Sequence, residues 1–172
     1  MRFRIEAAYY MPFNAHVHAG LPPPGIIQSS KVISMPLANP INITRIDHVV
    51  IRVRDMKAMI AFYRDVLGCK LERGPGELGL AQLRAGQSLI DLLDVNSRLG
   101  QLGGAAPDHG APNMDHVCLQ VLPWDVEAIE AHLAAHRVDY DSPADRYGAT
   151  GMGPSIYLRD TEGNTVELKG QV

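Results

Sequence analysis

The chain has 172 residues, of which 46% are hydrophobic and 20% charged, so it is long enough and apolar enough to bury a core as a soluble globular protein. Its net charge of -3 gives no reason to expect nucleic acid or an anionic membrane as a partner, and no apolar run approaches the ~20 residues that span a bilayer. Cys69 and Cys118 form no C-x-x-C motif and no disulfide framework, which favours a cytoplasmic setting.

The first 43 residues differ in composition from the rest of the chain. Six prolines occur before residue 41, and no helical or strand period is sustained there. This stretch also lacks the continuous apolar core of a secretory signal. We predict an irregular N-terminal extension over residues 1–43, followed by a folded domain over residues 44–172.

Two segments of the chain repeat each other. Residues 46–53 have the sequence IDHVVIRV, and residues 114–121, which lie 68 positions later, have the sequence MDHVCLQV. Asp, His, Val and the final Val are identical, and the apolar positions between them agree. A self-match of this kind predicts two copies of one supersecondary unit, here of about 60 residues.

The first copy begins with a strand over residues 46–53. Its alternation places His48 and Arg52 on one face and apolar residues on the other. A helix follows, with Asp55 as its N-cap and Gly68 as its stop. Three short strands are then expected within residues 69–74, 78–85 and 87–95.

The second copy repeats this order. Its first strand covers residues 114–121, and its helix runs from about 125 to 136 and is followed by Arg137 instead of a glycine. Short strands are expected near residues 138–141, 154–159 and 164–169, and the last two form a hairpin around a strong turn signal. The glycine-rich segment 146–155 does not fit a phosphate loop, so we expect a flexible loop at the mouth of a cleft.

These elements predict an α+β fold of two tandem βαβββ modules. Module one is expected over residues 44–96 and module two over 113–170, joined by a linker over 97–112 that is rich in Gly, Ala and Pro. Four strands cannot cover both of their own faces, whereas two curved mixed sheets placed together can enclose a cleft. The first strand of each module would carry a histidine into that cleft.

Each module offers one histidine and one carboxylate in matching positions. His48 and His116 lie on the first strands, and Asp91 and Glu167 lie between apolar neighbours on the last strands. An acid between two apolar strand residues points to the face opposite theirs. The four side chains therefore predict a site for one divalent metal ion, with Zn, Ni, Co, Mn or Fe as candidates.

Four segments give this domain a resemblance to a known family: DHVVIRVRDMKAMIAFYRDVLG, LIDLLDV, MDHVCLQV and SIYLRDTEGNTVELKG. The chain resembles the vicinal oxygen chelate superfamily, which includes glyoxalase I, bleomycin-resistance proteins, methylmalonyl-CoA epimerase and extradiol dioxygenases. The resemblance implies metal ligation by His48, Asp91, His116 and Glu167, and it places Arg52 where glyoxalase-like members contact substrate. It also implies a homodimer, in which modules pair within one chain or across two.

Three functions remain open from the sequence. The first is a metal-dependent, glyoxalase-like lyase or isomerase for a small substrate with adjacent oxygens, in which Glu167 or Asp91 removes a proton and the metal stabilises an enediolate. The second is an extradiol-type dioxygenase, with its metal held by two histidines and Glu167. The third is a non-enzymatic resistance protein that binds a small molecule, and four converging polar ligands argue against it. Candidates for lining the substrate cleft are Tyr157, Arg146 and Lys169.

Overall fold

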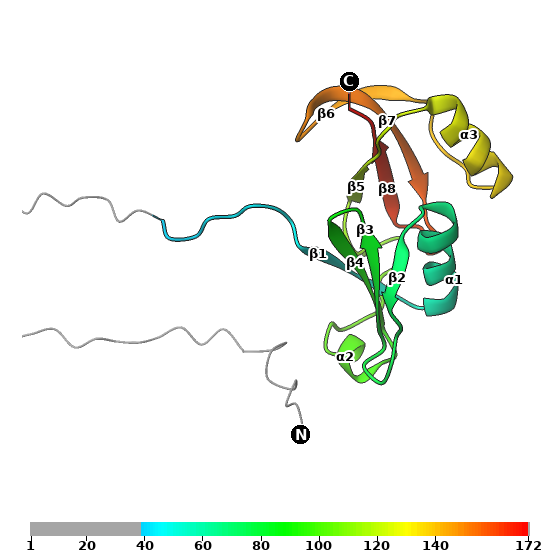
Figure 1. Ribbon diagram of the computed structural model, residues 1–172. Helices are drawn as coiled ribbons and strands as arrows, with labels where there is room; N and C mark the ends of the chain where they lie inside the picture. The colour runs from blue at the N-terminus through cyan, green and yellow to red at the C-terminus, as the bar shows by residue number, and fades with distance from the viewer. Residues whose placement is uncertain (1–38, 172) are drawn as a thin grey trace, which may run out of the picture. The chain divides into compact units, whose positions relative to one another are not determined.

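The computed structural model describes residues 39–171 (Figure 1). From Ile43 onward the chain forms one compact unit. The predicted irregular extension over residues 1–43 falls mostly on residues 1–38, which lie outside the described residues. Within the described part, no helix is long and apolar enough to cross a membrane.

Module one is a four-stranded mixed sheet with one helical segment. The sheet has the order β1-β4-β3-β2, and β1 runs parallel to β4 while the other pairs are antiparallel. The helix between β1 and β2 begins as an α-helix and ends as a π-helical turn, η1. The elements are β1 (His48–Val53), α1 (Met56–Ala61), η1 (Phe62–Val66), β2 (Lys70–Arg73), β3 (Leu80–Ala85) and β4 (Ser88–Asp94).

Module two repeats this topology. Its sheet has the order β5-β8-β7-β6, again with one parallel pair, β5 and β8. The connection between the modules holds one short helix, α2 (Arg98–Gln101). The elements of module two are β5 (His116–Gln120), α3 (Val126–Ala135), β6 (Ala144–Gly148), β7 (Gly151–Arg159) and β8 (Thr165–Lys169). The predicted α+β fold of two βαβββ modules is confirmed.

Two local predictions in module two are wrong. The strand expected at 138–141 is absent from the described chain, where Tyr140 makes only an isolated bridge to Leu158, and β6 lies further along. The segment 146–155 is the β6–β7 hairpin and not a flexible loop. Its glycines have packing reasons: a Cβ on Gly148 would lie 2.8 Å from Lys169 Cε, and one on Gly153 would lie 3.0 Å from Lys169 Nζ.

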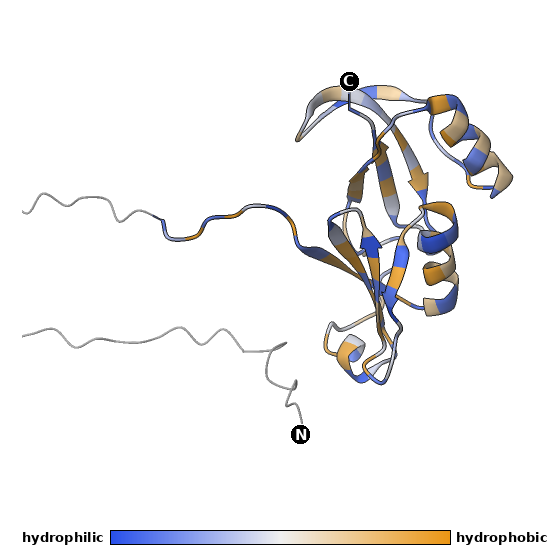
Figure 2. Cartoon of the chain, viewed as in Figure 1, coloured by the Kyte–Doolittle hydropathy of each residue, from blue (hydrophilic) through white to orange (hydrophobic). Residues whose placement is uncertain are grey.

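The strands are amphipathic, as the alternation predicts. Along β1, Ile51 and Val53 are fully buried, whereas His48 lies on the opposite, exposed face. Figure 2 shows this change of hydropathy from residue to residue along the strands. The buried side chains of both modules form one cluster, which extends from Ile51 in β1 to Leu168 in β8. The modules therefore share a single core.

The turn between β7 and β8, residues 160–164, joins module two to module one. Asp160 is 5% exposed, and its Oδ2 accepts hydrogen bonds from Asn164 Nδ2 at 2.8 Å and from the Tyr63 hydroxyl at 3.3 Å. Glu162 Oε1 accepts from the backbone N–H groups of Arg54 and Asp55, both at 2.6 Å. These N–H groups lie at the start of α1, where no intrahelical acceptor is available. A residue of module two therefore completes the capping of a helix in module one.

Arg137 offers a test of the backbone at the end of α3. It has a φ of 58°, whereas the residue in this left-handed region after α1 is Gly68, with a φ of 71°. A side chain costs about 1–2 kcal/mol in this conformation. We expect Arg137→Gly to raise the free energy of unfolding by about 1 kcal/mol, measured by urea denaturation. The matched variant is Gly68→Ala, whose added Cβ would meet no atom within 4 Å. It should lower stability by a similar amount, and equal midpoints for all three proteins would contradict the prediction.

Candidate metal centre

The first pair of candidate ligands lies on one face of the module-one sheet. Asp91 of β4 is 3% exposed, and its Oδ2 accepts a hydrogen bond of 3.0 Å from Gln82 Nε2 on β3. Gln82 is the direct register partner of Asp91. His48 lies on the adjacent strand, β1, and the pKa of its imidazole is raised first by a hydrogen bond to Asp47 and further by Coulombic attraction to Asp91. We call His48 and Asp91 half-site one.

The second pair lies on the corresponding face of the module-two sheet, which we call the site face of module two. His116 Nε2 of β5 is 3.4 Å from Glu167 Oε2 of β8, and Glu167 is 5% exposed. Tyr157 of β7 is the direct register partner of Glu167, and its ring meets the His116 ring edge-on at a centroid distance of 5.5 Å. We call His116 and Glu167 half-site two.

The two half-sites occupy equivalent positions in the repeat. His48 pairs with the residue two before Asp91 in the parallel ladder of β1 and β4. His116 pairs with the residue two before Glu167 in the ladder of β5 and β8. Because alternate residues of a strand share a face, each histidine and its carboxylate point to the same side of their sheet.

An aspartate orients each histidine. His48 Nδ1 bonds to Asp47 Oδ1 at 2.8 Å, and His116 Nδ1 bonds to Asp115 Oδ2 at 2.6 Å. The hydrogen bond that Asp47 accepts is the largest cause of the raised pKa of His48, and it lowers the pKa of Asp47. A carboxylate acceptor fixes the proton on Nδ1 and leaves the lone pair of Nε2 free, the arrangement found at many metal-bound histidines.

Each half-site also contains a buried carboxylate oxygen without a partner. Within residues 39–171, Asp91 Oδ1 and Glu167 Oε1 accept no hydrogen bond, although both are removed from solvent. Such orphaned oxygens are costly, because a buried charge is normally paired or bound to a metal. Two imidazole nitrogens and two carboxylate oxygens suit a first-row divalent metal. The residues present therefore fit the metal that the sequence predicts.

Within one chain, the four predicted ligands form two pairs and not one cluster. Among the described residues, no group of three or more His, Cys, Asp or Glu side chains is close enough to hold a metal ion. Half-site one supplies two ligands and half-site two supplies two. A complete four-ligand site requires that a half-site one and a half-site two come together.

Arg52, the predicted substrate-binding residue, shares a face with His48 but is engaged by the connection between the modules. Its Nη1 donates to Ala105 O at 2.8 Å, and its Nη2 donates to Gly104 O at 2.7 Å and Gly100 O at 3.2 Å. Gly103 packs directly on the guanidinium, where a Cβ would lie 2.7 Å from Arg52 Nε. These contacts anchor the linker. A role in substrate binding stays a prediction.

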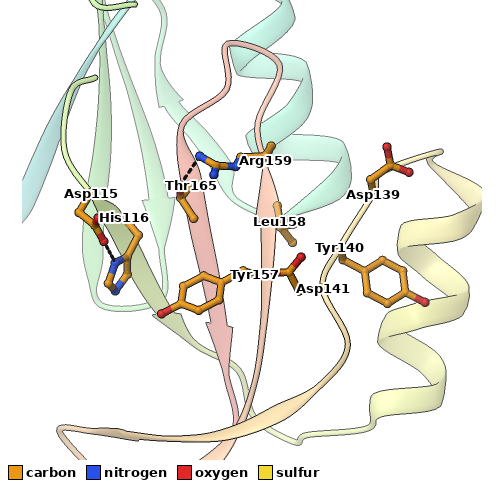
Figure 3. A pocket seen from close by; sticks show the side chains of 9 residues that line it. All are labelled: Asp115, His116, Asp139, Tyr140, Asp141, Tyr157, Leu158, Arg159 and Thr165. Atoms are coloured by element: carbon orange, nitrogen blue, oxygen red, sulfur yellow. Dashed lines mark hydrogen bonds and ion pairs between the residues drawn. The ribbon is translucent and has the colours of Figure 1, made fainter. Parts of the chain in front are cut away.

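A pocket of about 390 Å³ adjoins half-site two. His116 and Tyr157 line it on one side, and Figure 3 shows Asp115 bonded to the His116 ring beside them. Thr165, the register partner of His116, also lines the pocket, and its Oγ1 accepts a hydrogen bond of 2.5 Å from Arg159 Nη1. Desolvation, followed by repulsion from the Glu167 carboxylate, raises the pKa of the Tyr157 phenol, which keeps a proton donor at the edge of this pocket.

Of the residues that support the ligands, the sequence indicated Tyr157 as a candidate for lining the cleft, whereas Asp47, Asp115 and Gln82 were missed. Asp47 and Asp115 precede the histidines as an identical D-H pair in both copies, so the repeat contained a signal for them. Gln82 and Tyr157 stand opposite the two carboxylates on neighbouring antiparallel strands. Their positions depend on strand register, which the sequence pattern alone does not fix.

Comparison with known proteins places this architecture in one family. Residues 45–168 match the profile of the glyoxalase/bleomycin resistance protein/dioxygenase superfamily. The chain belongs to this superfamily.

Individual relatives show the breadth of the family. The chain is 30% identical over 135 residues to the virulence protein STM3117 of Salmonella typhimurium, covering 76% of this chain and 86% of that protein. It is 28% identical over 151 residues to the mitochondrial methylmalonyl-CoA epimerase of Bos taurus, covering 82% and 83%. The crystal structure of STM3117 superposes with a TM-score of 0.65, over 77% of this chain and 100% of that chain, at 26% identity. A lactoylglutathione lyase from Agrobacterium tumefaciens gives a TM-score of 0.54 at 25% identity, over 74% and 93%.

Proposed function

We propose that this protein is a metal-dependent lyase or isomerase whose centre combines half-site one of one chain with half-site two of a second copy. The observation that carries the proposal is a pair of buried carboxylate oxygens, one in each half-site, that accept no hydrogen bond from any described residue. One divalent ion between the half-sites would satisfy both. An epimerase and a lyase among the relatives support this class of reaction.

His48, Asp91, His116 and Glu167 would hold the metal, with Asp47 and Asp115 fixing the two imidazoles. When bound, the metal polarises two neighbouring oxygens of the substrate and stabilises negative charge that develops on them. The substrate is a small molecule with a carbonyl next to a second oxygen.

Glu167 is the proposed base. Among the described residues its Oε1 accepts no hydrogen bond, and its Oε2 lies 3.4 Å from His116 Nε2. The carboxylate would take the proton from the carbon beside the carbonyl, and the electrons of that C–H bond would move onto the carbonyl oxygen. Return of the proton to a carbon atom would complete an isomerisation. Tyr157, the register partner of Glu167, would donate a hydrogen bond to the substrate.

Mixing two variants tests the shared centre. His48→Ala breaks half-site one only, and His116→Ala breaks half-site two only. In a mixed dimer, one centre would combine the two intact half-sites and the other would combine the two broken ones. We expect neither variant alone to retain tightly bound metal. After co-refolding at equal amounts, metal content measured by mass spectrometry should recover, up to one ion per mixed dimer.

The control for this experiment is His136→Ala, which removes a histidine at the end of α3 that belongs to neither half-site. It should bind metal as the unmodified protein does. Metal retained by His116→Ala alone would contradict the ligand assignment. Metal uptake lost in each variant and not recovered on mixing would place the centre within one chain, and the two-chain proposal would fail.

A further inference from the structure

Lys169 is a buried cation beside half-site two. It is 4% exposed and lies two residues after Glu167 on β8, on the site face of module two. An ammonium group has three donors, and the hydrogen bond that Nζ makes within the described residues is to Gly153 O at 3.3 Å. A buried ammonium with unused donors is costly unless another group accepts hydrogen bonds from it.

The β6–β7 hairpin is shaped to hold this lysine. A Cβ atom added at Gly148 would lie 2.8 Å from Lys169 Cε and 3.1 Å from its Cδ. A Cβ atom added at Gly153 would lie 3.0 Å from Lys169 Nζ. Contacts below 3.4 Å leave a real side chain little room. The absence of side chains at these two positions therefore creates the space in which the lysine lies across the sheet.

A second cation lies on the same face. Arg146 Nη1 donates to Ser155 O at 3.0 Å and to Ser155 Oγ at 2.7 Å, and its Cζ lies 4.4 Å from the centre of the Tyr157 ring. These contacts hold the guanidinium between Tyr157 and Ser155, and Ser155 is the register partner of Lys169. Arg146 and Lys169 thus bring two positive charges to the strands beside the single carboxylate of Glu167.

We propose that Lys169, supported by Arg146, binds an anionic group of the substrate, so that the substrate class is a small dicarboxylate. The identity of the neighbouring oxygen pair rests on the proposed function, whereas the anion site does not. Glu167 and Lys169 are alternate residues of β8 and share one face of the sheet, so a small molecule with two carboxylates could meet the proposed metal and the ammonium together. Such an acid would pair the ammonium with a carboxylate, and charged hydrogen bonds of this kind are short and strong.

Malonate, a three-carbon dicarboxylate, is the probe. Isothermal titration of the full chain would be done twice, once after EDTA treatment and once with the metal restored. We expect metal-free protein to bind malonate more tightly than acetate, and Lys169→Met to weaken malonate binding by about tenfold or more. The matched control is Lys57→Met, which removes an exposed lysine of α1 and should leave the affinity unchanged.

A second variant moves the ammonium without removing its charge. Gly148→Ala places a methyl group against Cε and Cδ of Lys169 and should also weaken malonate binding, by severalfold, even if Lys169→Met fails to fold. Metal content is measured in parallel. Lys169-dependent binding of malonate to protein that takes up no metal would leave this site standing and refute the proposed function. Normal metal uptake with equal malonate affinity in Gly148→Ala and unmodified protein, or with no malonate binding at all, would overturn the anion site.

Discussion

Glu167→Gln is expected to lower kcat by about two orders of magnitude or more and to change KM by only a few fold. The amide keeps the size of the side chain and one oxygen for the metal, but it cannot take a proton. The loss should therefore fall on the proton-transfer step and not on substrate binding. The measurement is exchange in D₂O, followed by NMR as loss of the signal of the proton beside the carbonyl, across hemithioacetals, acyl-CoA compounds and small dicarboxylates.

Glu77→Gln is the matched control, because Glu77 is an exposed residue of the turn before β3. It should exchange the substrate proton at the rate of the unmodified protein. The competing dioxygenase hypothesis predicts a different result: oxygen uptake equal to turnover in an iron-loaded sample, without solvent deuterium in the product. That outcome would refute the lyase or isomerase proposal.

Asp160→Ala is expected to lower the free energy of unfolding by about 3 kcal/mol or more. The Asp160 carboxylate accepts four hydrogen bonds, and its removal leaves several buried donors without an acceptor. Oδ1 accepts from the backbone N–H groups of Glu162 and Asn164 at 2.9 Å each, and Oδ2 accepts from Asn164 Nδ2 and Tyr63. Burial, helped by the nearby Asp160 charge, raises the pKa of Tyr63, so its hydroxyl stays a donor that needs an acceptor.

Thermal unfolding gives the simplest measurement of this effect. A loss of this size corresponds to a fall in Tm of roughly 6–12 °C for a chain of this length. Asp145→Ala, on the exposed edge strand β6, is the control and should change stability by less than about 0.5 kcal/mol. If the two variants unfold at the same temperature, the turn 160–164 does not stabilise the contact between the modules.

The repeat made the fold and the ligand pairs predictable. Two copies of one D-H strand fix the module topology, and an acid between apolar residues fixes the face of Asp91 and of Glu167, because strand alternation is a local property. The same logic failed at β6. The order of its charged and small residues reflects Lys169, which crosses from β8, and a contact between strands leaves no local period in the sequence.

The sequence also did not predict that the two half-sites are separate within one chain. It depends on how the modules pack, and that packing is directed by isolated side chains such as Asn113, whose Nδ2 donates to Arg52 O at 2.9 Å and to Asn164 Oδ1 at 3.0 Å. The turn 160–164 was recognised by its own composition. Its contacts with module one involve partners about a hundred residues away, for which no spacing rule exists.

The cap that Glu162 places on α1 has a consequence for how the protein is made. Glu162 follows Asp55 by 107 residues, so a ribosome working at 5–20 residues per second exposes the start of this helix roughly 5–20 s before its cap exists. During that interval the buried face of α1 and the module-one sheet lack the core residues that module two contributes. Nascent chains stalled within it would present apolar surface to chaperones and proteases, whereas released chains that have paired the last strand would not.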